Sequence, residues 1–258
     1  AAVAAVPDDA AAVIVDAATS MSDADRAALQ TYLDAGGRAL FLLEPGAEAF
    51  SSLLGAYGLQ ANDDVIVDGS ALGGVLGPET ATGAAYATHP VTQKLGAALT
   101  HFQRARSLSE HPGTPATTTS LVQTGADAFG ALHLEPGVAP AFHDGDIQGP
   151  LTVMMAATAP SASSSPSSSS SHKKETRVVV AGDATFASNQ GIHLGANRDL
   201  VVNAVLWLVE RDDAIAIRPR GRGGDLLLLT PTARERIAFV LLYGLPVILL
   251  CAGLSISA

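Results

Sequence analysis

One carboxylate in this sequence follows a strand end, where an α/β protein usually places its chemistry. Residues 177–182, RVVVAG, read as a buried strand, and Asp183 follows at its carboxyl end, the edge at which parallel sheets bind ligands. A carboxylate there can act as a general base or hold a metal ion. No His, Lys or second acid accompanies it at a recognisable spacing, and Asp also accepts hydrogen bonds from the backbone of a following turn. The pattern therefore favours a structural Asp183 over a catalytic one.

Three further polar residues after Asp183 suit the same structural role. Asn189 and Asn197 have short side chains that hydrogen-bond backbone groups, and Asn197 is placed to cap the helix that begins beside it. Asp199 falls in the first turn of that helix, where the helix dipole stabilises a negative charge. We expect the loop after Asp183 to be a structural hinge and a contact surface.

Other motifs for catalysis or cofactor binding are missing from the sequence. It contains no P-loop of the form G-x-x-x-x-G-K-[ST] and no G-x-S-x-G nucleophile elbow. Its seven histidines form no H-E-x-x-H motif, and its single cysteine, Cys251, lies in an apolar stretch that disfavours a thiolate. The run HDGD at 143–146 reads as a turn rather than as a metal site. These observations predict a protein that is not an enzyme and uses no cofactor or metal ion.

The composition is that of a folded domain with an acidic surface. The 258 residues are 48% hydrophobic and 16% charged, which is enough apolar material for a full core. The net charge is −10, and the 15 Lys and Arg residues are spread thinly along the chain. Because nucleic-acid binding requires a clustered basic surface, we expect no nucleic-acid partner.

Strand and helix patterns alternate in the N-terminal half of the chain. Residues 11–16, 38–43 and 63–68 read as short buried strands, and the runs between them read as helices, the first with Ser22 as its N-cap. Successive strand–helix–strand passages favour parallel strands, because the crossover helix packs back onto the sheet. The expected fold class is therefore α/β, a mostly parallel sheet that also includes 177–182 and is flanked by helices. Residues 69–150 read as an irregular excursion from that sheet.

The C-terminal half adds a hairpin and an apolar tail. Residues 151–159 and 176–183 read as two strands joined by the Ser-rich tract 160–174, which is too polar to order itself. Residues 237–254 carry no charge and are long enough, at about 1.5 Å per residue, for a membrane-spanning helix. The expected organisation is a soluble α/β domain over 1–213 with a disordered insertion at 160–174, a juxtamembrane linker over 214–233, and a transmembrane helix over 234–258.

The block from residue 176 to residue 218 carries a family likeness. A strand ending in Gly-Asp is followed by Phe-x-x-Asn, and Asn-Arg-Asp then opens a helix that contains Asn and Trp. In these features the chain resembles the GldG-type auxiliary components of ABC transport systems, which include the gliding-motility auxiliary proteins. HPVTQKL at 89–95 and FQRARSL at 102–108 are similar to the middle of that family. The motif residues are Gly182, Asp183, Phe186, Asn189, Asn197, Arg198, Asp199, Asn203 and Trp207.

The resemblance implies a fold, a set of partners and a location. The fold would be related to class I glutamine amidotransferases and to flavodoxin, without a Cys where that enzyme fold places its nucleophile. The partners would be the permease and ATPase subunits of an ABC transporter. The location would be the bacterial inner membrane with the soluble domain outside the cytoplasm, although the arginines before the apolar tail favour the cytoplasmic side by the positive-inside rule.

The sequence leaves three functions open. The first is a non-enzymatic, membrane-anchored accessory subunit of an ABC-type transport system that acts through contacts with protein or substrate. The second is a membrane-tethered hydrolase that uses Asp183. The third is a sensory or carbohydrate-binding module built on the same scaffold.

Overall fold

The computed structural model describes residues 5–7, 9–16, 21–47, 50–161, 175–215, 236–237, 239–244 and 246. The chain divides into two units, Ala1–Gly224 and Asp225–Ala258, and every strand of the described residues belongs to the first. Its helices are α1 (Asp23–Asp34), α2 (Ser51–Gly55), α3 (Ala71–Leu76), the 3-10 turn η2 (Thr185–Ala187), α4 (Asn197–Leu208) and α5 (Asp212–Ile215). Its strands are β1 (Val13–Asp16), β2 (Arg38–Leu42), β3 (Leu59–Ala61), β4 (Val65–Asp68), β5 (Thr80–Gly83), β6 (Ala85–Tyr86), β7 (Thr100–Gln103), β8 (Leu108–Glu110), β9 (Thr117–Gln123), β10 (Ala128–Ala131), β11 (Ile147–Gln148), β12 (Thr152–Pro160) and β13 (Glu175–Ala181).

The central sheet has eight strands and mixed directions. Its order is β1-β2-β13-β12-β8-β3, with β9 also paired to β12 and β6 paired to β9. β13 lies in the middle of this sheet, parallel to β2 on one side and antiparallel to β12 on the other. The carboxyl end of β13, where Asp183 follows, therefore lies beside the carboxyl end of β2.

The prediction of a mostly parallel, flavodoxin-like sheet is wrong. β1, β2 and β13 do run parallel, but every other strand pair of the central sheet is antiparallel. One cause is that β12 and β13 are the arms of a hairpin, and a hairpin needs no crossover helix between its strands. The other cause lies in residues 69–150, which form the short strands β5 to β11 rather than an irregular excursion.

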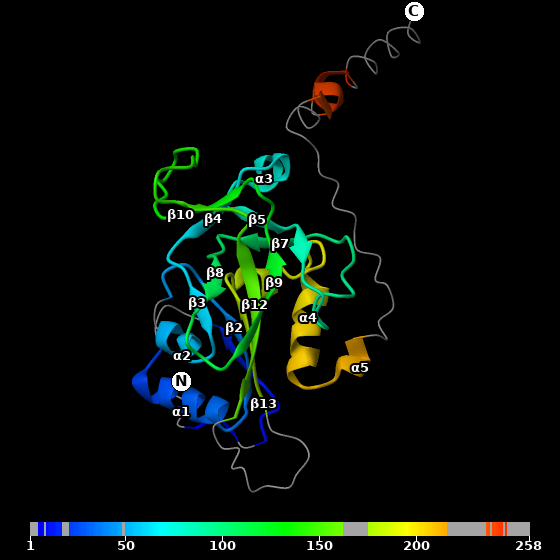
Figure 1. Cartoon of the computed structure of the whole chain (residues 1–258). Coiled ribbons are helices and arrows are strands. Elements are labelled where there is room, and N and C mark those ends of the chain that lie inside the picture. The colour runs from blue at the N-terminus through cyan, green and yellow to red at the C-terminus, as the bar shows by residue number, and fades with distance from the viewer. Residues whose placement is uncertain are drawn as a thin grey trace, which may run out of the picture. The chain divides into compact units, whose positions relative to one another are not determined.

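Two apolar layers cover the two faces of the central sheet. Along β13, Val178 and Val180 pack into the layer that contains α1 and α2, whereas Val179 and Ala181 pack into the layer that contains α4. Side chains alternate between the faces of a strand, so one apolar run supplies both layers. Figure 1 shows α1 and α2 on one side of the sheet and α4 on the other. Ser22 is the N-cap of α1, as the sequence predicts, and its hydroxyl accepts the N–H of Asp25.

Two smaller sheets lie beyond the carboxyl end of the parallel strands (Figure 1). One has the order β11-β10-β4, and the other pairs β5 with β7. The segment between β7 and β8 connects them to the central sheet. Ile66 of β4 donates a backbone hydrogen bond to Ala105 of this segment, and the neighbouring Arg106 donates one to Gly182, directly after β13. The loop between β10 and β11, residues 132–146, projects from the first of these sheets (Figure 1).

The second unit contributes few described residues. Its described helical segment includes the π-helical turn η3 (Val240–Gly244). Within the part of the chain that the structure describes, no helix is long and apolar enough to cross a membrane. The predicted transmembrane helix over 234–258 thus has no counterpart among the described residues, and the π-turn that ends at Gly244 is an irregularity which the apolar composition does not reveal. The Ser-rich residues 162–174, the linker residues 216–233 and most of the predicted span lie outside the described residues.

Candidate functional site

Strand β13 ends at a very close backbone approach. The N–H of Gly182 donates to the carbonyl of Val153 on β12 (2.9 Å), and its own carbonyl accepts the N–H of Arg106 (2.8 Å). A Cβ atom at residue 182 would lie 2.0 Å from the Arg106 carbonyl oxygen. Glycine is therefore required at this position for the segment 104–108 to lie against the strand end.

Asp183 is fully buried, and both of its carboxylate oxygens accept backbone hydrogen bonds. Oδ1 accepts the N–H of Thr185 (2.6 Å), and Oδ2 accepts the N–H groups of Phe186 (3.1 Å) and of Gln103 (2.7 Å) on β7. Burial raises the pKa of Asp183 to about 7, against the lowering effect of the hydrogen bonds, and the carboxylate of Glu44 adds to the rise. With no exposed atom, this carboxylate does not reach a substrate in this structure.

Asn197 binds the backbone of β7 rather than capping α4. Its Oδ1 accepts the N–H of His101 (2.9 Å), and its Nδ2 donates to the carbonyls of His101 (2.7 Å) and Gly191 (2.9 Å). The predicted cap at Asn197 is wrong, because the N-cap is Ala196, which makes no side-chain capping bond. An amide that pairs with both the N–H and the carbonyl of one residue mimics a neighbouring strand, which explains its complete burial.

Two further motif residues attach α4 to the segment 89–95. The Nδ2 of Asn203 donates to the carbonyl of Val91 (2.8 Å), and both residues are buried. The ring of Trp207 meets the ring of His89 edge to face at 4.8 Å. His89 Nδ1 accepts the N–H of Val91 (3.2 Å), and burial, with the adjacent Arg177 charge, lowers the pKa of His89 to about 4.

The buried motif residues therefore share one function in the fold. Each holds part of the segment 89–103 against β13 and α4, and Phe186 completes the set by packing on Phe102 at 5.0 Å. These contacts run in opposite directions along the two segments, so the first motif residue contacts the end of the segment 89–103 and the last contacts its beginning. We call these five residues the buried clamp: Asp183, Phe186, Asn197, Asn203 and Trp207.

Three other motif residues lie at the surface. Asn189 is exposed on the loop after η2, and its side chain makes no hydrogen bond with the rest of the described chain. Arg198 and Asp199 are exposed in the first turn of α4, and Asp199 occupies the position that the helix dipole favours. These three are the motif residues that are exposed to solvent.

Two buried charged residues escaped the sequence reasoning. Arg106 is 2% exposed, and its guanidinium donates to the carbonyls of Asn62 (2.7 Å), Glu44 and Ala61 (both 3.4 Å). Asp64 is 3% exposed and accepts the N–H and the hydroxyl of Ser107 (2.8 and 2.7 Å). The pKa of Asp64 is raised above its usual value, because burial outweighs the lowering effects of its hydrogen bonds with Ser107 and of the nearby Arg106 charge. The only signal in the sequence was the run FQRARSL, since no local pattern distinguishes a buried arginine from an exposed one.

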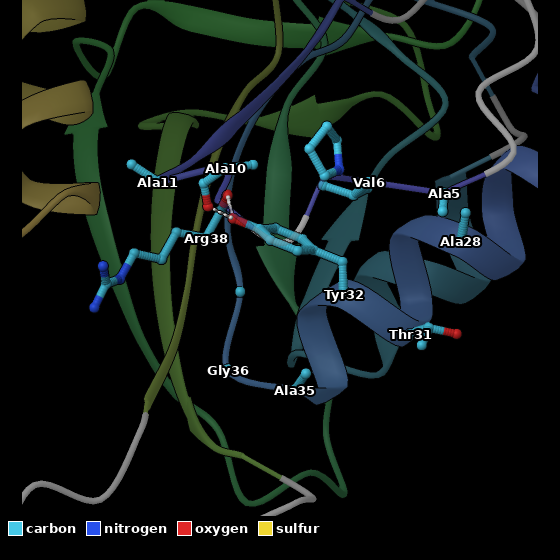
Figure 2. Close-up of a pocket in the computed structure, with 12 residues that line it drawn as sticks. Ala5, Val6, Ala10, Ala11, Ala28, Thr31, Tyr32, Ala35, Gly36 and Arg38 are labelled. Atoms are coloured by element: carbon cyan, nitrogen blue, oxygen red, sulfur yellow. Dashed lines mark hydrogen bonds between the residues drawn. The ribbon is translucent and has the colours of Figure 1, made fainter.

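A pocket of about 440 Å³ lies at the opposite end of the parallel strands from Asp183, at the amino end of β2. Figure 2 shows its walls, which come from the N-terminal segment, from α1 and from the turn before β2. The Tyr32 hydroxyl donates to the carbonyls of Ala10 and Arg38, and the Arg38 side chain points away from the cavity (Figure 2). No Asp, Glu, His or Cys lines it. The pocket thus offers no carboxylate, imidazole or thiol that could act as an acid, a base or a nucleophile.

The described residues also hold no group of three or more His, Cys, Asp or Glu side chains arranged to bind a metal ion. Asp144 and Asp146 of the HDGD run belong to the β10–β11 loop, where Asp146 accepts the backbone N–H groups of Leu132 (3.1 Å) and His143 (2.8 Å). That carboxylate supports the loop itself.

Comparison with known proteins gives one family and a shared fold. The family model described as ABC-type uncharacterized transport system matches residues 1–204. Among solved structures, the chain is similar to the mmIFT52 N-terminal domain at 18% identity and a TM-score of 0.51, over 73% of this chain and 72% of that one. It is also similar to a putative ThuA-like protein from Bacteroides uniformis at 15% identity and a TM-score of 0.39, over 78% and 71% of the two chains. No curated protein matches it. At such identity the first likeness shows the fold alone.

Proposed function

Because the chain belongs to the family of ABC-type uncharacterized transport system proteins, we propose that it is a non-enzymatic accessory component of such a system. It acts by contact with the permease and ATPase subunits or with the transported substrate. The burial of Asp183 carries this proposal. Asp183 is the residue best placed for catalysis, but both of its carboxylate oxygens accept hydrogen bonds, from three backbone N–H groups in all. A hydrolase that uses Asp183 would need that carboxylate to reach a substrate.

The shape of the buried clamp supports a scaffold in preference to a catalyst. A catalytic site keeps polar groups facing a cavity, whereas all five clamp residues direct their polar groups or rings at one neighbouring segment, 89–103. The described pocket at the amino end of β2 has no Asp, Glu, His or Cys in its lining to take the place of Asp183. We infer that the motif preserves the domain's shape and that function depends on its surface.

We place the domain at the bacterial cell membrane, beside the permease with which it associates. The side is the extracytoplasmic one, as the resemblance of the motif implies. The family match to a transport system supports this location.

Affinity purification of the full chain from its native membranes tests the proposal. A tagged chain, extracted in mild detergent after brief chemical crosslinking, should recover one multi-span permease and one P-loop ATPase in comparable amounts. An unrelated tagged protein of the same membrane is the control. Recovery of the chain without either transporter subunit would contradict the proposed function, as would a hydrolytic activity of the pure chain that Asp183→Asn abolishes without unfolding it.

A further inference from the structure

The β10–β11 loop, residues 132–146, exposes an unusual amount of apolar surface. Leu132, Val138 and Phe142 are 44%, 59% and 49% exposed, and these are half of the six exposed large hydrophobic side chains described in the first unit. Single exposed apolar residues are ordinary on a protein surface, but a group of them in one loop marks a contact site.

This loop has an ordered backbone, so the apolar side chains are held outward. Asp146 accepts the N–H groups of Leu132 and His143 and thereby closes the base of the loop. Gly137 (φ 80°) and Gly145 (φ 103°) supply the left-handed conformations of two tight turns, one of them closed by the bond from the Val138 N–H to the Glu135 carbonyl (3.2 Å). Phe142 packs edge to face on Phe129 of β10 at 5.6 Å. A pre-ordered loop loses little conformational entropy when it binds.

A cavity of about 470 Å³ opens among these side chains. Leu132, Leu134, Val138 and Pro140 line its apolar part, and Glu135 and Asp144 are among the charged residues of its lining. A concave site lined by apolar side chains and flanked by charged ones is typical of the pocket that accepts an anchor residue in a protein interface.

The charge around this cavity has one sign. Residues 127–148 contain four carboxylates, from Asp127, Glu135, Asp144 and Asp146, and no Lys or Arg. The same lack of Lys and Arg extends over the whole stretch 107–172. A partner that binds here by complementary charge must therefore be basic.

We propose that the β10–β11 loop is the docking site for a protein segment that presents an apolar side chain flanked by Lys or Arg. The inference rests on the proposed function and names the surface through which this domain meets a partner of the transport system. A second copy of this chain that docked through the same loop would bring the same carboxylates to the interface and be repelled. A bilayer is disfavoured as well, because anionic headgroups repel the carboxylates of this loop and it carries no Lys or Arg to attract them.

Two matched synthetic peptides provide the test. Both are 18-residue amphipathic helices with the same leucine face, one with lysines and the other with glutamates on its polar face. Fluorescence anisotropy measures their binding to the purified full chain at low and at high salt. The lysine peptide should bind and weaken with salt, and the glutamate peptide should not bind.

Three variants locate the binding. Val138→Ser should weaken the lysine peptide at least fivefold, because it removes the most exposed apolar side chain of the loop. Glu135→Lys should weaken it by a similar factor at low salt only. Val202→Ser, at an exposed valine of α4, is the matched control and should bind as the wild type does.

The outcomes separate this inference from the proposed function. Equal binding by Val138→Ser and wild type, or no binding of the lysine peptide, overturns the loop as docking site and leaves recovery of the transporter subunits unaffected. Co-sedimentation of the wild type, but not of Val138→Ser, with phosphatidylcholine vesicles would identify a bilayer as the occupant and also overturns it. If the peptide binds as expected but no transporter subunit is recovered with the chain, the proposed function fails and the docking surface stands.

Discussion

The loop after β13 and the loop after β10 contrast in where their side chains point. In the first, residues 182–197, two polar side chains turn inward, since Asp183 and Asn197 are fully buried and hydrogen-bond backbone groups that include those of Gln103 and His101 on β7. In the second, residues 132–146, the apolar groups turn outward, and Val138 and Phe142 are about half exposed. Each arrangement reverses the usual preference, which places apolar residues inside and polar residues outside.

The contrast separates stability from contact. Buried polar side chains that hydrogen-bond the backbone of a distant segment fix that segment in one arrangement. Their loss leaves buried backbone donors and acceptors unpaired. Exposed apolar groups contribute little to the folded state but gain when another molecule covers them. The motif between Gly182 and Trp207 is therefore the part that maintains the fold, and the candidate contact surface lies where the sequence shows no motif.

The largest effect is expected at Asp183. Asp183→Ala leaves three buried backbone N–H groups without an acceptor and should lower the free energy of unfolding by about 3 kcal/mol or more. Asp183→Asn keeps one acceptor oxygen and should cost about half as much. Urea unfolding of both variants, followed by circular dichroism, measures the difference.

Asp144→Ala is the control for that experiment, since Asp144 is an exposed carboxylate of the β10–β11 loop. It should leave the urea midpoint unchanged. An Asp183→Ala variant as stable as wild type would break the comparison, because catalytic carboxylates, not structural ones, are the residues whose removal leaves stability intact or raised.

Asn197 should come second in the size of its effect. Asn197→Ala removes three hydrogen bonds between α4, β7 and Gly191, all of them buried, and should cost about 2 kcal/mol. Asn189→Ala changes the same residue type in the same motif at an exposed position and should cost less than about 0.5 kcal/mol. Similar thermal midpoints for the two variants would show that the buried clamp does not hold β7.

Prediction from the sequence succeeded where the signal was local. The buried strand before Asp183 and the N-cap at Ser22 follow from nearby residues, and both are found. The mixed sheet was missed because strand direction depends on which strands pair. The pairing of β9 with β12 joins segments that are far apart in the sequence, and the hydrophobic periodicity within each segment does not predict it. The role of Asn197 was missed for the same reason, since His101 lies 96 residues earlier in the chain.

His89 gives the comparison a pH dependence. Its pKa of about 4 in the folded chain lies below its usual 6.5, because burial and Arg177 disfavour the charged ring. The stability that the neutral ring contributes is therefore fully present above pH 6.5 and is lost as the pH falls toward 4. His89→Asn retains an acceptor for the N–H of Val91 and does not titrate, so its unfolding free energy should fall less over that range.

Urea unfolding at pH 7.5, 5.5 and 4.5 checks this expectation, with His193→Asn as the control at an exposed histidine. The control should follow the wild type at every pH. An acid dependence that is the same in His89→Asn and in wild type would mean that the contact between His89 and Trp207 does not depend on a neutral ring.

The smallest effect is expected at Val138, and its smallness is what the comparison requires. Val138→Ser removes a side chain that is 59% exposed, so the free energy of unfolding should change by less than about 0.5 kcal/mol. The same substitution at Val179, which is fully buried in β13, leaves a cavity and an unpaired hydroxyl and should cost about 3 kcal/mol. Thermal unfolding of the two serine variants compares them directly. If Val138→Ser lowered stability by more than 1 kcal/mol, the loop would be packed against the domain and would not be free to bind a partner. If stability is unchanged while binding of the lysine peptide is lost, the apolar side chains of this loop serve contact and not folding.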